Sequence, residues 1–306
     1  MTQLRAAFTA AALAALAVSS AAFAQSKAPD LGVGPFHINT DRGPVRKVDF
    51  SALKGPASND VLAGPTNGLD SALLVYNRIA AGVGPKGLYS LPVDHTYLVL
   101  KGKLNVQIGT DTFVLEPESL ALVPAGVPHR AWNAGAAPVD DFQAFASAPT
   151  RDLAGMMKPA VARKVENAAQ YIRIPPRLDK LAGEGLHDSL NERILASYET
   201  GSKQVHERLN DVLPKGGRTV IHMHPFDQVY FVREGSLTLN YSYEKMEVGP
   251  DSLVVLPKGL PHSNENNGTG VQRLITLLLP APPKGSPLGA TAPWLKPPAQ
   301  VQPAGQ

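Results

Sequence analysis

Three histidines lie at spacings that suit a single metal ion. His222 and His224 are two residues apart, and His262 follows after a further strand, turn and strand. Residues two apart in an extended segment face the same side of a sheet, and an imidazole from a later strand can complete a facial set. We therefore expect His222, His224 and His262 to bind a divalent metal. The alternative is that the three side chains only pack or hydrogen bond inside the protein.

Gln228 and Arg218 are two polar residues close to these histidines in the sequence. The Gln228 amide either coordinates the metal through its oxygen or hydrogen bonds to a ligand or substrate. Arg218 shares strand parity with His222, so it either clamps an anionic substrate inside the protein or lies solvated at the rim. Both are candidate catalytic residues. Three neutral imidazoles and an amide would leave a divalent ion its full charge, which makes it a strong Lewis acid.

The chain contains an internal duplication. Residues 84–133 and 217–266 align without a gap at a constant offset of 133, with 15 identical positions among 50, where chance gives roughly three. The identical positions include several turn-forming residues and one histidine, His129 in the first copy and His262 in the second. Tyr230 repeats as Tyr97, which favours a packing role for this tyrosine.

Both copies resemble the cupin superfamily. The first cupin motif is matched by His222, His224, Gln228 and Gly235, with glutamine in place of the usual glutamate, and the second by Pro257, Gly259, His262 and Asn266. The resemblance implies an all-β fold, two tandem double-stranded β-helix (jelly-roll) barrels joined by a short helical connector. It also implies one active and one supporting copy, because that arrangement is common in cupins with two barrels.

The first copy lacks the histidine pair. Tyr89 and Leu91 stand at the positions of His222 and His224, and His95 stands at the position of Gln228. Tyr89, His95 and His129 would form a weak metal site, because a phenol titrates near pH 10. We expect a structural barrel or a metal-free pocket here.

Composition and turn residues divide the rest of the chain. The segments are a signal peptide (1–24), an extended arm (25–70) that packs across a neighbouring barrel, barrel 1 (71–150), a connector (151–195), barrel 2 (196–280) and a proline-rich tail (281–306). Short β-rich runs separated by turns fill both barrels. The connector from 151 to 171 is alanine-rich and predicted to be helical on either side of Pro159. The tail is predicted to be polyproline-like or disordered.

The N-terminal composition indicates export. One charge, Arg5, precedes an alanine- and leucine-rich run that ends in Ala22-Phe23-Ala24, which is typical of a Sec signal cleaved after Ala24. The mature protein is then periplasmic or secreted, with no membrane attachment. The chain has no cysteine, which excludes thiolate ligands and disulfides. Its 29 basic residues are dispersed, so nucleic acid is not an expected partner. Monomer and homo-oligomer both remain open.

The site and the resemblance together favour one function. We expect an exported cupin with two barrels that uses one metal ion per chain, Fe(II) being favoured over Zn, Cu, Mn or Ni, as a dioxygenase acting on a small oxygenated organic compound. A non-catalytic periplasmic protein that binds metal or a small molecule is the alternative, because zinc and copper outcompete ferrous iron for imidazole sites. A non-redox isomerase or lyase is a third reading.

Overall fold

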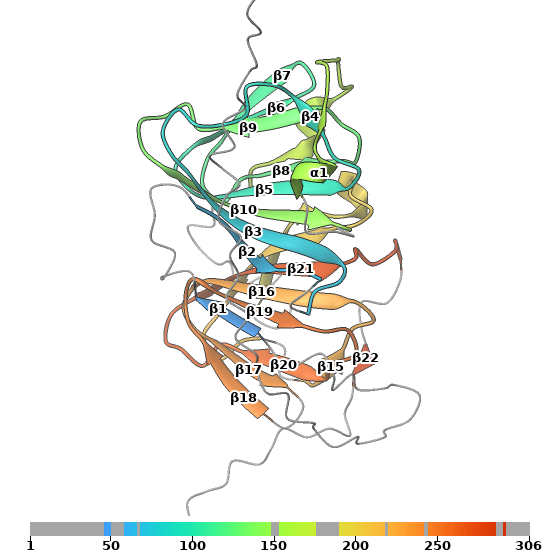
Figure 1. Ribbon diagram of the computed structural model, residues 1–306. Helices are drawn as coiled ribbons and strands as arrows, with labels where there is room; N and C mark the ends of the chain where they lie inside the picture. Colours follow the sequence, from blue (N-terminus) through green and yellow to red (C-terminus); the bar gives the residue numbers. More distant parts are fainter. Residues whose placement is uncertain are drawn as a thin grey trace, which may run out of the picture.

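The protein forms two β-barrels stacked on one another (Figure 1). A computed structural model describes residues 46–49, 58–65, 68–147, 153–175, 190–217, 220–241, 244–285 and 290–291. The helices of these ranges are three or four residues long: α1 (Leu153–Met156), η3 (Ala168–Tyr171) and η4 (Tyr198–Thr200). The predicted all-β class is confirmed. None of the helices in these ranges is long and apolar enough to cross a membrane.

Barrel 1 consists of a six-stranded and a five-stranded antiparallel sheet. The six-stranded sheet has the order β12 (Ile172–Arg173), β8 (Leu120–Val123), β5 (Asp94–Lys101), β10 (Val139–Ala146), β3 (Ala72–Ile79) and β2 (Ser58–Ala63). The five-stranded sheet has the order β11 (Lys158–Pro159), β4 (Tyr89–Ser90), β9 (His129–Trp132), β6 (Leu104–Ile108) and β7 (Asp111–Leu115). From β3 to β10 each connection crosses from one sheet to the other, except that β6 and β7 are neighbours in the five-stranded sheet.

Barrel 2 repeats this arrangement. Its six-stranded sheet has the order β1 (Arg46–Asp49), β19 (Ser252–Leu256), β16 (Asp227–Glu234), β21 (Gln272–Leu279), β14 (His206–Val212) and β13 (Leu190–Ala196). Its five-stranded sheet has the order β18 (Glu244–Val248), β17 (Leu237–Tyr241), β20 (His262–Glu265), β15 (His222–Met223) and β22 (Ala290–Thr291).

The strand registers confirm that the duplication is structural. In barrel 1, Gln143 pairs with Tyr97 on one side and with Val75 on the other. In barrel 2, Thr276 pairs with Tyr230 and Arg208. Each residue of the second set lies 133 positions after the corresponding residue of the first set. The offset of the sequence repeat therefore extends into strands outside the aligned blocks.

The two six-stranded sheets pack back to back through a shared apolar core. Side chains on a strand alternate between faces, so Val229 and Phe231 point toward barrel 1, whereas Tyr230 and Val232 belong to the interior of barrel 2. The Phe142 and Phe231 rings lie 5.4 Å apart between centroids. The outward face of each six-stranded sheet therefore joins the barrels, and its inward face lines the interior of its own barrel.

Both barrels have different boundaries from those expected. β2 lies in the predicted arm (25–70) but pairs with β3 of barrel 1, and β13 lies in the predicted connector (151–195) but pairs with β14 of barrel 2. Each barrel therefore begins before its predicted limit, because an outer strand of its large sheet precedes the repeated block. β1, also in the arm, pairs with β19 of barrel 2.

The connector and the tail also supply strands. Pro159 was expected to separate two helices, but it lies in β11, which pairs with β4, and the helices on either side are α1 and η3, each of four residues. The predicted polyproline-like or disordered tail contributes β22, which pairs with β15. The predicted signal peptide (1–24) and most of the tail lie outside the described residues.

Candidate metal centre

The three predicted histidines come together inside barrel 2. His222 opens β15 and pairs across the sheet with His262, the first residue of β20. His224 follows β15, and its backbone carbonyl accepts a hydrogen bond from the Gly259 amide at 2.8 Å. This bond ties the loop that carries the first motif to the loop that carries the second. One nitrogen from each imidazole lies within 4.8 Å of the other two, and all three side chains are buried.

Backbone carbonyls fix the orientation of two of these imidazoles. The Nδ1 of His222 lies 2.9 Å from the carbonyl oxygen of Val220, and the Nδ1 of His262 lies 2.9 Å from that of Leu260. A carbonyl oxygen only accepts, so both Nδ1 atoms donate and each Nε2 keeps its lone pair. Neutral imidazoles held in one tautomer by an outer hydrogen bond are the usual metal ligands in proteins. The donor set therefore fits a divalent ion.

Gln228 lies next to the histidine cluster as expected. It is buried on β16, with its Oε1 2.7 Å from the Nε2 of His262. The His262 lone pair faces this oxygen, and two acceptors at that distance repel each other unless the amide turns its N–H toward the imidazole or a cation binds both atoms. The geometry therefore accommodates both roles predicted for Gln228, as a ligand or as a hydrogen-bond donor.

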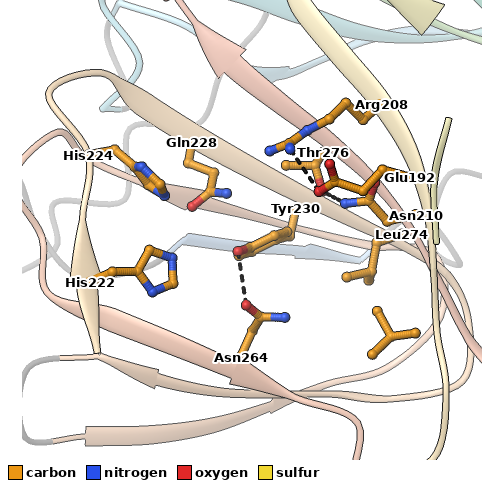
Figure 2. A pocket seen from close by; sticks show the side chains of 11 residues that line it. Glu192, Arg208, Asn210, His222, His224, Gln228, Tyr230, Asn264, Leu274 and Thr276 are labelled. Atoms are coloured by element: carbon orange, nitrogen blue, oxygen red, sulfur yellow. Dashed lines mark hydrogen bonds and ion pairs between the residues drawn. The ribbon is translucent and has the colours of Figure 1, made fainter. Parts of the chain in front are cut away.

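A hollow between the two sheets of barrel 2 opens beside the cluster. Its volume is about 420 Å³ when the open space at its mouth is included. The enclosed part has room for about one water molecule. Figure 2 shows His222, His224 and Gln228 at one side of the hollow. Tyr230, predicted to pack, is buried and also lines this hollow, where its hydroxyl donates to Asn264 Oδ1 at 3.3 Å.

The far side of the hollow holds residues that the sequence did not reveal. Arg208 and Asn210 face it from β14, and Glu192 faces it from β13. Arg208 Nη1 donates to Glu192 Oε1 at 2.8 Å, and Asn210 Nδ2 donates to Thr276 Oγ1 at 3.0 Å. A signal was available, because Asn210 lies 133 positions after Asn77, but no strand was predicted there. Arg218, predicted either to clamp an anionic substrate or to lie solvated at the rim, lies outside the described residues.

The corresponding histidines of barrel 1 bond to protein groups instead. His129 Nδ1 donates to the Val127 carbonyl at 2.8 Å, which leaves its Nε2 as acceptor for the Nδ1 of His95, 3.1 Å away. The Nε2 of His95 lies 2.9 Å from Gln143 Oε1. Burial lowers the pKa of His129 to about 4, and burial and the neighbouring His129 lower the pKa of His95. Tyr89 bonds through its hydroxyl to that of Tyr97 at 2.6 Å.

Apolar side chains fill the rest of the equivalent space in barrel 1. The cluster contains Leu73, Val75, Leu91, Val93, Phe145 and Met156, each at most 7% exposed. Leu91 stands at the position of His224 and Val75 at that of Arg208. This packing fits the expectation of a supporting barrel, because the ring nitrogens of His95 and His129 contact protein groups and apolar side chains fill the space.

Comparison with known proteins places this fold among the cupins. The cupin domain model matches residues 89–140 and 211–278, one stretch in each barrel. Each barrel therefore contains a cupin domain, and the chain has two cupin repeats. No curated protein sequence matches it.

Solved structures share the two-barrel fold at low sequence identity. The salicylate 1,2-dioxygenase of Pseudoaminobacter salicylatoxidans with gentisate is 12% identical, with a TM-score of 0.60 over 78% of this chain and 81% of that one. A variant of the same enzyme with gentisate is 10% identical, with a TM-score of 0.59 over 78% of this chain and 82% of that one. A cupin 2 conserved barrel domain protein from Leptotrichia buccalis is 12% identical, with a TM-score of 0.52 over 76% of this chain and 96% of that one.

Proposed function

We propose that the protein is a metal-dependent dioxygenase that acts on a small oxygenated organic compound. The observation that carries the proposal is the buried cluster of three histidine nitrogens within 4.8 Å of one another, beside a hollow that opens between the sheets. The fold shared with a dioxygenase of two cupin barrels supports it. We favour Fe(II) because an ion with three imidazole ligands keeps open positions, and ferrous iron supplies both a binding position and electrons for O2.

The residues of barrel 2 have distinct tasks in this proposal. His222, His224 and His262 hold the ion, and the carbonyls of Val220 and Leu260 keep two of the imidazoles in the ligating tautomer. Gln228 adds no negative charge, so the bound ion keeps its full attraction for an anionic substrate. Tyr230 presents a hydroxyl that Asn264 orients at the wall of the hollow.

Metal content and oxygen uptake test the proposal together. Mature protein recovered from its own compartment is compared with a His222→Ala/His224→Ala variant purified in the same way. We expect about one iron per chain, lost in the variant, and oxygen uptake with a phenolic acid or a diketone. Turnover that survives exhaustive metal removal, or that persists in the variant, would refute the proposal.

Export is part of the proposal and has its own test. We propose that the Sec pathway removes residues 1–24 and delivers the protein to the periplasm or the medium. Sequencing of the N-terminus of the mature protein should begin at Gln25. A chain that retains Met1 in the cytoplasm would contradict this part and leave the metal site unaffected.

A non-catalytic metal-binding protein is the second candidate. The narrowness of the hollow favours it, because the space inside is close to that of one water molecule. Stoichiometric zinc or copper, with no consumption of any tested compound, would support this function over the first.

A further inference from the structure

On the side of the hollow away from the histidines, two buried polar atoms have no hydrogen-bond partner among the described residues. They are the Nε of Arg208, a donor, and the Oδ1 of Asn210, an acceptor. The two residues are only 7% and 4% exposed, and both line the hollow. Leaving such groups unpaired costs folding free energy. A ligand that accepts from Arg208 and donates to Asn210 would remove that cost.

The fold itself does not need an arginine at position 208. Val75 occupies the position of Arg208 in barrel 1, where it packs in an apolar cluster, and the strand pairing is the same in both barrels. A buried arginine at this point in barrel 2 therefore has no evident structural task, which points to a ligand.

A protein carboxylate already contacts the guanidinium. Glu192 Oε1 lies 2.8 Å from Arg208 Nη1, and Figure 2 shows the pair at the side of the hollow away from His222 and His224. The Glu192 side chain is 33% exposed, whereas that of Arg208 is 8% exposed. Water can solvate the glutamate when it leaves, but the arginine stays buried and needs a replacement. The exchange replaces one carboxylate with another on the buried guanidinium, so no unpaired buried charge remains after it.

We infer that Arg208 and Asn210 form a subsite for a small carboxylate that carries a hydroxyl group, and that the Glu192 carboxylate occupies the guanidinium until the ligand displaces it. The planar guanidinium suits a carboxylate, and the Asn210 oxygen accepts from the hydroxyl. The substrate of the proposed dioxygenase would then be a small carboxylate with a hydroxyl group, and this part of the inference rests on the proposed function. Its binding chemistry is independent of the metal.

Calorimetric titration with glycolate tests the subsite. Glycolate is the smallest carboxylate that carries a hydroxyl group, and it takes the space that the departing Glu192 carboxylate leaves. Glycolamide lacks the charge, and acetate lacks the hydroxyl. Full-length mature protein is compared with Glu192→Gln, Arg208→Gln and a control, Glu234→Gln, whose exposed carboxylate pairs with Arg273 outside the hollow.

We expect Glu192→Gln to bind glycolate about tenfold more tightly than the wild type, because the competing charge is gone. Arg208→Gln should bind glycolate at least about tenfold more weakly than the wild type, and the affinity of Glu234→Gln should stay within about twofold of the wild type. Acetate should bind less tightly than glycolate, and glycolamide least tightly.

Several outcomes would overturn the inference. They are an unchanged or weaker affinity in Glu192→Gln, equal binding of glycolamide and glycolate, or no glycolate binding by either the wild type or Glu192→Gln. If Arg208→Gln fails to fold by circular dichroism, the Glu192→Gln result still decides.

Repeating the titration in the His222→Ala/His224→Ala background separates the two proposals. Glycolate binding that persists there, without oxygen uptake by the unmodified protein, would support the subsite and count against the dioxygenase. Loss of glycolate binding in that folded background would show that the metal centre, and not Arg208, holds the anion.

Discussion

Equivalent positions of the two barrels carry opposite chemistry on the same backbone. His224, Arg208 and the hollow of barrel 2 correspond to Leu91, Val75 and a packed apolar cluster in barrel 1. His129 and His262 are identical and both donate Nδ1–H to a carbonyl two residues earlier. They differ in what faces Nε2, which is His95 in one barrel and Gln228 in the other. A conserved local geometry thus supports a metal centre in one copy and a core contact in the other.

The largest expected difference between the barrels is in metal content. His262→Ala should lose the bound ion, because it removes one of three converging nitrogens, whereas His129→Ala should keep it. Elemental analysis of both variants after identical purification gives the answer. Equal metal loss in both would show that barrel 1 also binds metal and would break the comparison.

The second largest difference is expected in the free energy of unfolding when Val75 and Arg208, which occupy equivalent positions, are each replaced by the residue of the other barrel. Val75→Arg places an unpaired charge in the apolar cluster and should lower the free energy of unfolding by about 3–5 kcal/mol. Arg208→Val should change it by less than about 1 kcal/mol, because the Glu192 left behind reaches water. Denaturant titration measures both. A Val75→Arg variant as stable as the wild type would mean that barrel 1 has hidden room.

Two equivalent aspartates offer a subtler test. Asp94 Oδ1 accepts from the Ala125 amide and Asp227 Oδ1 accepts from the Lys258 amide, both at 3.0 Å, in the turn before each second-motif histidine. Each alanine variant should lose about 1–3 kcal/mol of stability. Only Asp227→Ala should also weaken metal binding, by about tenfold, because its turn leads to His262. Competition with a chelator measures this, and equal metal affinity in the two variants would contradict it.

The smallest expected effect is a pH dependence at the contact between the barrels. Glu207, whose counterpart is Leu74, is buried and accepts from Thr96 of barrel 1 at 3.0 Å. Burial raises the pKa of Glu207 to about 8 from an ordinary 4.5. The folded protein therefore keeps a proton that the unfolded chain releases, and stability contributed by this group falls as pH rises through that window.

Glu207→Gln removes this proton release. Its melting temperature relative to wild type should therefore rise between about pH 5 and pH 8. Thermal unfolding at both pH values measures the difference, with Glu247→Gln as an exposed control. A constant difference between the two proteins would show that Glu207 is ionised in the fold.

The histidine cluster and the fold could be predicted because they lie in compact, repeated motifs. His222, His224, Gln228 and His262 fall within one block of the duplication, and the spacing of strand residues places them on one face. The pairing of β15 with β20 then brings His222 and His262 together. In this part of the chain, local sequence determines most of the geometry.

The opposite wall of the hollow was not predictable for a physical reason. β14 carries charged or polar residues on both faces, since Arg208 and Asn210 point into the hollow whereas Glu207 points toward barrel 1. Such a strand shows no alternation of apolar and polar residues, which is the main signal of a β-strand in a sequence. Glu192 adds a further difficulty, because it joins the hollow only through the long-range pairing of β13 with β14.

The pairing of β1 with β19 has a consequence for the order of folding. Arg46 lies opposite Val255, so the earliest described strand to be synthesised completes a sheet whose other strands are all made much later. Closing so long a loop has an entropic cost, and the edge of β19 stays unpaired until β1 joins it. Open edges invite pairing with another chain. By pairing with β19, β1 of the same chain takes the place that a strand from a second copy would otherwise fill.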